Sequence, residues 1–394
     1  MPKRILKKNK YQVVGELQRM DQADTIIARR DLVPDSELWQ RYYQKFPELE
    51  GEGRGWAELQ ASQFRRTGIP PQDTLMASAI YSTIHALSAE ELVDGKPAPE
   101  KIVIDPGRAS QKIKGFAHHL GADLVGIGPL NQAWTYSRTG RSGNTSVPIG
   151  TTINLPHQHA IVVAVHYERD DIECAPHFHV GLATLEIYIR LSAIVVTLGQ
   201  YIRSLGYSAR AHNFNFQVMD IPLAIDAGFG ELARNGILIT EEYGNNTKTM
   251  SVTTDLPLED DKPVDIGVDE FCTQCKICAE ICPAGAIPRG DKRVVRGVRK
   301  WKIDAEACFK YWLHTGSNCS LCIAYCPWTR PRTFPHNLIL KAVERSSTAR
   351  KIAIEADKVL LREKKRRIPF WLEEYPEVWR GVLKPNHPFY RQRQ

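Results

Sequence analysis

Eight of the nine cysteines lie within 55 residues, at spacings that suit metal ligands. The first run begins at Cys272 and reads C-x2-C-x2-C-x3-C, ending at Cys282 with a proline directly after it. The second run begins at Cys308, resumes after ten residues and ends at Cys326, again before a proline. Thiolates at such short spacings hold zinc or iron–sulfur clusters, so this segment predicts metal chemistry.

Iron–sulfur ligation accounts for both runs. In the C-x2-C-x2-C-x3-C-P pattern of bacterial ferredoxins, the fourth cysteine ligates the other cluster, so each predicted set draws on both runs. One predicted 4Fe–4S ligand set is Cys272, Cys275, Cys278 and Cys326, and the other is Cys282, Cys308, Cys319 and Cys322. Two neighbouring clusters pass single electrons onward, which predicts a role in reduction or oxidation.

Zinc and disulfides explain these cysteines less well. Two zinc knuckles need only four cysteines and leave the C-x3-C-P ends without a role. Disulfide frameworks belong to short secreted chains, whereas 394 residues can bury a large core. The ninth cysteine, Cys174, is predicted to pack as a small buried hydrophobic residue rather than as a ligand.

Composition is that of an ordinary globular protein of two or three domains, with 43% hydrophobic and 25% charged residues and a net charge of +7. Basic residues gather at 3–10 and 362–367, but no recognition motif accompanies them, so no nucleic-acid partner is expected. These runs form either a solvated face or a docking surface for an acidic electron donor or an anionic lipid.

No apolar stretch reaches the roughly 18 residues of a membrane span, since the longest, 191–202, contains polar residues. The basic first ten residues are not followed by the apolar segment of a signal peptide. As written, the chain is therefore expected to be cytoplasmic. If a leader has been removed, the protein is instead exported, as many cluster-containing proteins are.

Four regions are predicted along the chain. They are an N-terminal helical and loop-rich cap (1–109), a cofactor-binding core (110–265), a ferredoxin-like two-cluster module (266–336) and a C-terminal helix with an aromatic tail (337–394). Within the core, helices at 112–120 and 183–205 alternate with strands at 122–128, 160–167 and 250–254. This alternation predicts an α/β or α+β core. The cap contains a segment of helical length at 73–92.

The core has no dinucleotide fingerprint. A G-x-G-x-x-G motif after a strand would indicate flavin or nicotinamide, but Gly126-Ile-Gly128 fails at Pro129. A second glycine pair, Gly228 and Gly230, forms either a structural turn or a turn that lets the backbone approach a bulky cofactor. Both interpretations stay open, and the pair is kept as a cofactor-binding candidate.

A series of short motifs leads into the first cysteine run. They are G-Y-S-A (206–209), I-P-L-A (221–224), A-G-F-G-E (227–231), T-T-D-L-P-L (253–258) and D-K-P (261–263). This order resembles the corrinoid-dependent reductive dehalogenases, as do the segments 15–22 and 134–136. The resemblance implies a nitroreductase-like cobalamin core that carries a ferredoxin-like module. Epoxyqueuosine reductases share both parts and are the alternative family. They fit less well because of the long cap before residue 110 and because the chain ends soon after the clusters.

The resemblance also implies the cofactor chemistry. Members hold cobalamin base-off, and this chain has no D-x-H-x-x-G motif to supply a histidine to cobalt. Loss of that ligand makes reduction to Co(I) easier, and low-potential clusters can supply the electrons. The protein then contributes orientation, exclusion of water and a proton.

By the family pattern, the proton donor is a tyrosine on the helix before L-G-Y-x-A, which falls on Tyr188, with Thr184 one turn earlier as a cofactor-binding candidate. A phenol titrates near pH 10 and needs a neighbouring cation to tolerate the phenolate. Lys248 matches the basic residue that the family places before T-D-L-P. Relatives often carry arginine there, and lysine lacks its planar fork.

Further residues are candidates for the lining of the substrate pocket. The family places an asparagine of the pocket after L-G-Y-x-A, where Asn215 is favoured as a catalytic residue over Asn213 as a cofactor contact. His314 is expected to be structural or at the surface. Four aromatic residues could line an apolar pocket, although core packing is the better interpretation of each one. They are Trp39, Trp56, Trp134 and Tyr136.

The sequence therefore predicts reductive removal of halide from a small organohalide, with a low-potential electron donor. It does not decide between an alkane, an alkene and an arene, or between a cobalt–halogen bond and electron transfer to the substrate. The resemblance further implies that, if a twin-arginine leader has been removed, the protein is exported and associated with the outer face of the cytoplasmic membrane. A small membrane-anchor protein and a homodimer also stay open as partners. The competing functions are an epoxyqueuosine reductase acting on tRNA and a plain electron-transfer protein without a corrinoid.

Overall fold

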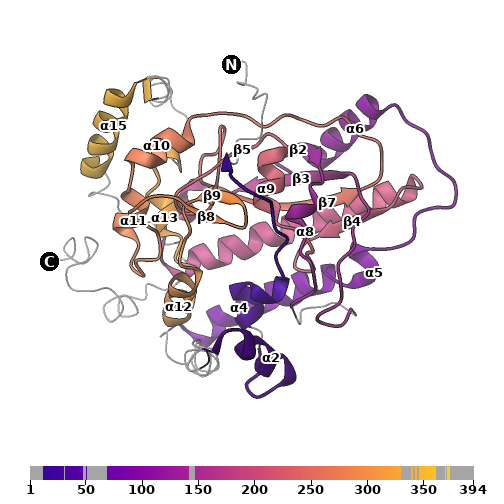
Figure 1. The fold of residues 1–394 in the computed structure, drawn as a ribbon, viewed down its shortest axis with the longest axis horizontal. Helices are drawn as coiled ribbons and strands as arrows, with labels where there is room; N and C mark the ends of the chain where they lie inside the picture. The colour runs from indigo at the N-terminus through magenta and orange to yellow at the C-terminus, as the bar shows by residue number, and fades with distance from the viewer. Residues whose placement is uncertain are drawn as a thin grey trace.

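The computed structural model describes residues 12–30, 32–47, 50, 69–141, 147–329, 339, 342–343, 346–360, 369 and 371–372. Its centre is an antiparallel sheet of four strands in the order β2-β3-β7-β4. These strands are β2 (Leu124–Pro129), β3 (His159–His166), β7 (Thr247–Thr254) and β4 (Ala209–His212). Figure 1 shows the segments that carry the eight cysteines gathered at one end of the molecule, beside this sheet.

Strand β3 is buried on both faces, which explains its continuous run of apolar residues. Ile161, Val163 and Val165 belong to the core on the side of helix α8 (Phe178–Ser204). The alternate residues Ala160 and Val162 belong to the core on the side of helix α9 (Asp220–Asp226). Because side chains alternate along a strand, one apolar segment supplies both cores.

Helix α8 begins and ends at residues suited to those positions. His177 caps its N-terminus by accepting a hydrogen bond from the amide of His179. Gly206 follows its C-terminus with φ +87°, and a Cβ there would lie 2.3 Å from the carbonyl oxygen of Glu100, so only glycine fits. The helix packs against β3, β4 and β7. The predicted helix at 183–205 is confirmed, although it begins five residues earlier.

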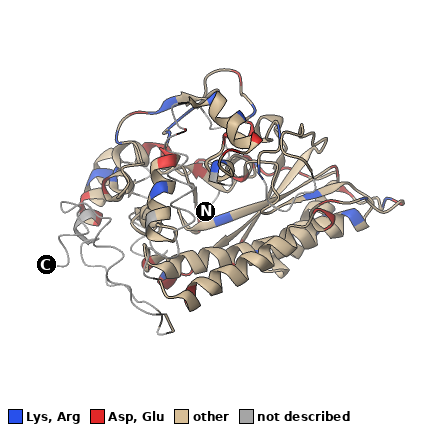
Figure 2. Ribbon diagram, turned by 90° about the horizontal axis from the view of Figure 1, so that it is seen from below, with Lys and Arg blue, Asp and Glu red and all other residues tan. Residues whose placement is uncertain are grey.

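The length and composition of α8 would also allow it to cross a membrane, and it is the single such helix in the described ranges. This corrects the expectation that no segment is long and apolar enough. Such a helix is weak evidence for a span, because the core helix of a globular domain meets the same criteria. Of its most apolar stretch, 56% is buried inside the protein. Figure 2 shows the long helices drawn mostly as uncharged residues.

The cap packs on the outer side of α8. Helix α4 (Pro71–Leu87) lies against α8, and the short α5 (Glu90–Val93) follows it. The predicted helix at 73–92 is interrupted at Ser88 and Ala89, where the backbone amide of Ser88 donates to the carbonyl of His85 and closes the last turn. The other elements of the cap and core are β1 (Gln12–Val13), η1 (Gln22–Asp24), α1 (Ile26–Arg30), α2 (Glu37–Lys45), α6 (Pro106–His119), η3 (Gln132–Trp134), α7 (Arg169–Glu173), β5 (Gly230–Leu232) and β6 (Leu238–Thr240).

The cluster module consists of short helices and one hairpin. Its elements are α10 (Val268–Gln274), α11 (Ile277–Ile281), β8 (Arg293–Val295), β9 (Val298–Lys300), α12 (Ala305–Thr315), α13 (Leu321–Ala324) and η4 (Pro327–Thr329). The hairpin turns at Arg296 and Gly297, which both have positive φ, as a tight two-residue turn requires. Strand β1 pairs with β9 and completes a three-stranded sheet. Neither this sheet nor β4 to β6 was predicted.

The C-terminal part is described only in pieces. Helix α15 (Ser347–Leu360) falls inside the predicted C-terminal helix and contacts α10. The basic runs at 3–10 and 362–367 lie outside the described residues.

The predicted combination of a mixed helix–sheet core with a two-cluster module is confirmed. The predicted domain boundaries stay a prediction.

Candidate active site and iron–sulfur ligand sets

The first predicted ligand set comes together from both cysteine runs. Burial raises the pKa of the Cys278 thiol well above its usual range, and the negative charges of Cys272 and Cys326 raise it further. Burial likewise raises the pKa of Cys326, with contributions from Cys272 and Cys275. Cys326, at the end of the second run, therefore faces three cysteines of the first run, as the crossed pairing predicts.

The second set shows the reciprocal arrangement. Burial raises the pKa of Cys319 well above its usual range, and the charges of Cys322, Cys308 and Cys282 add to this rise. Burial raises the pKa of Cys308 to about 11, with Cys282 as the next cause. A buried thiolate is costly without a partner, and bound iron removes this cost because cysteine ligates iron in its deprotonated form.

Neither set matches a site for one metal ion. Within the described residues, no three or more His, Cys, Asp or Glu side chains are placed to hold a single ion. Four thiolates around an iron–sulfur cube lie farther apart than four ligands of one ion, because each thiolate binds its own iron. Cys174, in contrast, is fully buried, as predicted.

A buried arginine fixes the backbone of the first ligand loop. The guanidinium of Arg234 is 2% exposed and donates to the carbonyl of Cys272 at 2.8 Å and of Cys275 at 3.2 Å. It also donates to Pro288 and Gly290. All of these acceptors are main-chain carbonyls, so the guanidinium charge faces the ligand loop without a carboxylate among its hydrogen-bond partners.

Lys248 lies between two tyrosines on the face of the sheet that α8 covers. It pairs in register with Val165, whose side chain packs on the α8 side, and paired residues share a face. The ammonium lies 5.9 Å from the ring centroid of Tyr188, which is half-buried on α8. It lies at the same distance from the ring of Tyr167, which directly follows β3. The predicted pair of Tyr188 and Lys248 is thus brought together.

The charge on Lys248 is favoured by its neighbours. Burial opposes the charge, but the nearby phenols of Tyr167 and Tyr188 outweigh it and raise the pKa of Lys248 above its usual value. Burial raises the pKa of Tyr167, and Lys248 acts in the opposite direction. Lys248 therefore stays an ammonium near neutral pH and favours the phenolate form of a neighbouring tyrosine.

Thr184 supports Tyr167 rather than Tyr188. Its hydroxyl lies 2.8 Å from the phenol oxygen of Tyr167 and donates to the carbonyl of Val180 at 2.7 Å. Because Thr184 uses its single proton on Val180, the Tyr167 phenol donates to Thr184. The contact fixes the ring of Tyr167 beside Lys248. The cofactor-binding role predicted for Thr184 stays a prediction.

The Lys248 site adjoins the second ligand set. Burial raises the pKa of Cys322 to about 12, and the charge of Lys248 is among the groups that lower it. Asn235 donates to the carbonyl of Cys322 at 3.3 Å and to the side chain of Asn245 at 2.7 Å, which ties the core to this loop. The set containing Cys322 is therefore the one nearer the tyrosines.

An apolar cluster surrounds the half-buried ring of Tyr188. Phe214 packs edge-on against it, with ring centroids 5.3 Å apart. The remaining members come mainly from α4 and α8, with Leu372 from the C-terminal region. They are Ile69, Ala77, Ile80, Ile84, Phe178, Leu182, Leu185, Ile189 and Leu372. The ring of Tyr188 therefore borders an apolar part of the core.

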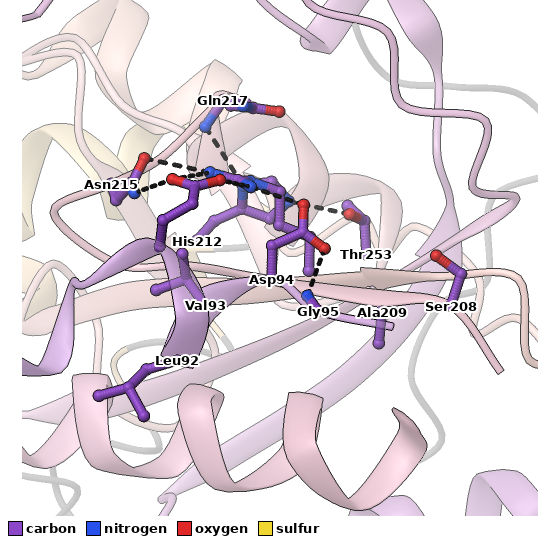
Figure 3. A network of polar contacts seen from close by, with 12 residues as sticks. Leu92, Val93, Asp94, Gly95, Ser208, Ala209, His212, Asn215, Gln217 and Thr253 are labelled. Carbon is purple, nitrogen blue, oxygen red and sulfur yellow. Dashed lines mark hydrogen bonds and ion pairs between the residues drawn. The ribbon is translucent and has the colours of Figure 1, made fainter. Parts of the chain in front are cut away.

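The two asparagines flank Phe214 and form hydrogen bonds with the cap and with Arg210. Asn215 donates to Glu90 at 2.7 Å and accepts from Arg210 at 3.1 Å, and Figure 3 shows it within this polar network. Asn213 donates to the carbonyl of Leu87 at 2.9 Å. Their contacts in the described chain hold the loop that carries Phe214, and none joins either asparagine to Tyr188. Their predicted pocket roles stay predictions.

The two candidate glycines are crowded by the protein's own backbone. A Cβ on Gly228 would lie 2.6 Å from the carbonyl oxygen of Lys262, and one on Gly230 would lie 1.9 Å from that of Ile239. Gly228 has φ +80°. Local packing alone therefore requires glycine at both positions, and their cofactor role stays a prediction.

Three of the four candidate aromatic residues are core residues, as expected. Trp134 donates to Asp226 at 2.8 Å, and Tyr136 packs near Phe216 with ring centroids 5.9 Å apart. Trp39 is 2% exposed. Trp56 and the side chain of His314 lie outside the described residues.

A family model for the 4Fe-4S dicluster domain matches residues 271–329. The tetrachloroethene reductive dehalogenase of Sulfurospirillum multivorans is 30% identical over 310 residues, which are 71% of this chain and 60% of that protein. That of Desulfitobacterium hafniense is 32% identical over 280 residues, or 60% of this chain and 51% of that protein. The solved structure of the catabolic reductive dehalogenase NpRdhA with 3-bromo-4-hydroxybenzoic acid matches with a TM-score of 0.71 and 28% identity, over 91% of this chain and 49% of that one.

The chain is related to the reductive dehalogenases. It spans about half the length of the curated relatives that it matches first. A further matching structure of a reductive dehalogenase, at 27% identity and a TM-score of 0.71, is one from which a mechanism for B12-dependent dehalogenation was suggested. Epoxyqueuosine reductase is more distant: that of Lactococcus garvieae is 28% identical over 147 residues, or 32% of this chain and 38% of that protein.

Polar atoms near the tyrosines are compatible with a corrinoid, the cofactor that the reductive dehalogenase resemblance implies. Asn246 Oδ1 and Thr247 Oγ1, directly before Lys248, are buried and have no hydrogen-bond partner among the described residues. The same is true of Ser317 Oγ, which faces Gly181 near the start of α8. Unpartnered buried polar atoms are costly, and the amide groups around a corrin ring can supply the missing partners. The residues present therefore fit such a group.

The sequence did not reveal that Tyr167, Phe214 and Arg234 contact predicted residues of this reductive dehalogenase-like site. The side on which Tyr167 lies could have been predicted. Tyr167 follows Val163 and Val165 at a spacing of two residues, and side chains at this spacing along a strand face the same side. Phe214 lies between the two candidate asparagines, and the family pattern pointed to the asparagines alone. For Arg234 no sequence signal exists, because its partners are main-chain carbonyls 38 or more residues away.

Proposed function

We propose that this chain is a reductive dehalogenase that removes halide from a small apolar organohalide at a base-off corrinoid. Two electrons and one proton convert a carbon–halogen bond into a carbon–hydrogen bond and release halide. When bound, the corrinoid supplies a low-valent cobalt as the source of electrons for this bond. Asn246, Thr247 and Ser317 are the residues proposed to bind it.

The observation that carries this proposal is the position of Lys248 between Tyr188, Tyr167 and the ligand set of Cys322. Tyr188 donates the proton from its phenol oxygen, because its ring is half-buried and borders the apolar cluster. Lys248 supports the phenolate that remains. Tyr167, anchored by Thr184, keeps the ammonium in place.

The apolar surroundings support the substrate class. A small halogenated hydrocarbon gains free energy by leaving water for the cluster around Phe214 and Leu185, whereas a charged substrate would need a counter-ion there. Exclusion of water also strengthens the interaction between Lys248 and the developing phenolate.

The test is halide release from chlorinated and brominated alkanes, alkenes and arenes, with reduced viologen as electron donor. The protein is purified without oxygen and loaded with corrinoid and iron. We expect halide release together with two four-iron clusters and one cobalt per chain. A chain that holds both cofactors and releases no halide from any of the three classes would refute the proposal. A chain that holds clusters but no corrinoid would indicate a plain electron-transfer protein.

A further inference from the structure

The β8–β9 hairpin concentrates the positive charge of the chain. Residues 288–302 contain seven basic residues and one acidic residue, a net charge of +6, whereas the whole chain of 394 residues carries +7. The segment separates Cys282 from Cys308 and belongs to the cluster module. Outside this hairpin, the two signs of charge nearly cancel.

Much of this charge is exposed and without a partner. Arg289, Arg293, Arg299 and Lys302 are exposed, and none of them forms an ion pair with another residue of the described ranges. Burial lowers the pKa of the neighbouring Lys300, and the positive charges of Arg296 and Lys302 lower it further. The basic residues therefore repel one another, and an acidic partner would relieve this repulsion.

The hairpin is held tightly beside the cluster ligands. One guanidinium, that of Arg234, donates to Pro288 and Gly290 at the base of the hairpin and to Cys272 in the ligand loop. Lys292 forms an ion pair with Asp269 on α10, the helix that carries Cys272. A molecule bound on the hairpin is thereby brought close to a cluster ligand set.

A cleft opens at the base of the hairpin. It has a volume of about 510 Å³, and its lining includes the basic residues Lys292, Arg293 and Lys302 together with Asp291 and Asp304. Asp304 caps the N-terminus of α12, the helix that carries Cys308. The cleft thus offers shape as well as positive charge next to the second ligand set.

We propose that the β8–β9 hairpin and this cleft form the docking surface for an acidic protein that delivers single electrons to the clusters. The inference rests on the proposed function, because that function needs an electron donor, and it names the chemistry of that donor. In each transfer, the donor protein loses one electron and a cluster gains it, with no bond formed or broken. A nucleic acid or an anionic membrane could also bind basic residues, but neither requires a hairpin fastened to the cluster ligands.

The experiment uses the cluster-loaded chain and an acidic flavodoxin as the probe. Binding of oxidised flavodoxin is measured by calorimetry, and cluster reduction by reduced flavodoxin is followed by stopped-flow absorbance. The test variant is R293E/R299E/K302E. The matched control is K96E/R108E/K112E, which reverses three exposed charges outside the cluster module. Reduced viologen, a small cationic donor, reports whether the clusters themselves remain reducible.

We expect the hairpin variant to bind flavodoxin at least tenfold more weakly and to be reduced by it at least tenfold more slowly at low salt. Its reduction by viologen should change less than twofold, and the control variant should behave as the unmodified chain does. The proposal would be overturned if the hairpin variant bound flavodoxin as tightly as the control variant and the unmodified chain do. A second result would also overturn it: the unmodified chain binds anionic vesicles or RNA, the hairpin variant does not, and the hairpin variant is still reduced by flavodoxin at the normal rate. Neither readout needs corrinoid or organohalide, so a failure here is distinct from a failure of the proposed function.

Discussion

The ammonium of Lys248 lies 5.9 Å from the ring of Tyr188, although the two residues are 60 positions apart and come from a strand and a helix. The strand register places Lys248 on the face that α8 covers. A phenol loses its proton more readily beside a fixed cation, since the cation stabilises the phenolate. This proximity is the basis of the proposed proton transfer from Tyr188.

Removal of the Tyr188 hydroxyl should abolish most of the dehalogenation. We expect Tyr188→Phe to lower the rate of halide release by about 10²–10⁴-fold, the usual contribution of a positioned general acid. Lys248→Met should act in the same direction, and Lys248→Arg should retain part of the activity because the charge remains. Halide release is measured with reduced viologen as donor.

The matched control for this series is Tyr201→Phe. Tyr201 lies on the same helix and packs on Phe116 with centroids 5.4 Å apart, within the core on the far part of α8. It should leave halide release unchanged. Iron and cobalt contents are measured for every variant, and a normal rate in a fully loaded Tyr188→Phe protein would exclude Tyr188 as the proton donor.

Paired cysteine substitutions should reveal the crossed ligation. Cys282 and Cys308 belong to the same set, so C282A/C308A should lose one cluster and retain about four irons per chain. Cys282 and Cys326 belong to different sets, so C282A/C326A should lose both clusters. Iron analysis and electron paramagnetic resonance measure the outcome, and C174A serves as the control with both clusters intact.

The opposite pattern would contradict the crossed pairing. If each run ligated its own cluster, C308A/C326A would retain one cluster and C282A/C308A would retain none.

Arg234 should raise the reduction potential of the cluster beside it. A positive charge stabilises the more negative reduced state, so Arg234→Gln should lower the potential of the cluster held by Cys272 and Cys275. A tenfold change in the reduction equilibrium corresponds to a shift of 59 mV for one electron. Redox titration followed by electron paramagnetic resonance measures this shift.

Arg203 provides a matched control for Arg234. It is also buried and donates to three main-chain carbonyls, those of Leu92, Val93 and Ala209. It lies in the last turn of α8, whereas the cluster module contacts the start of this helix, where Ser317 faces Gly181. Arg203→Gln should lower the thermal stability to a similar extent and leave both cluster potentials unchanged. Equal potentials in the two variants would show that Arg234 acts only on the stability of the fold.

Asp226 should make stability depend on pH. It is 4% exposed, accepts one hydrogen bond from Trp134, and its Oδ1 has no partner among the described residues. Burial raises the pKa of this carboxyl to about 6. As the pH rises from 4 to above 6, the unfolded chain releases this proton before the folded chain does, so ionisation destabilises the folded state.

Asp226→Asn keeps an acceptor for Trp134 and removes the ionisation. Its thermal midpoint should exceed that of the unmodified chain at pH 8 and approach it at pH 4.5. The difference in unfolding free energy should be on the order of 2–3 kcal/mol, since each unit of pKa shift corresponds to about 1.4 kcal/mol. A difference that is the same at both pH values would mean that Asp226 is not buried as an ionisable group.

The two-cluster module could be predicted from the sequence because cysteine spacing is a local signal. The crossed pairing stays a prediction, and the structure brings Cys326 near Cys272 and Cys275 as that pairing requires. Strand β3 could be predicted from its continuous apolar, β-branched run, and helix α8 from its length and the glycine that follows it. The interruption after α4 was not predicted, because no glycine or proline marks it in the sequence.

For the site around Lys248, the sequence determined the residue types and the family pattern determined which tyrosine to choose. Only the tertiary structure placed Tyr167 beside Lys248, because strand parity and register decide which side chains share a face. Likewise, only the fold joined Arg234 to the ligand loop and fastened the basic hairpin beside the clusters. Local spacing can encode metal ligands, whereas contacts between distant segments depend on how the sheet and helices pack.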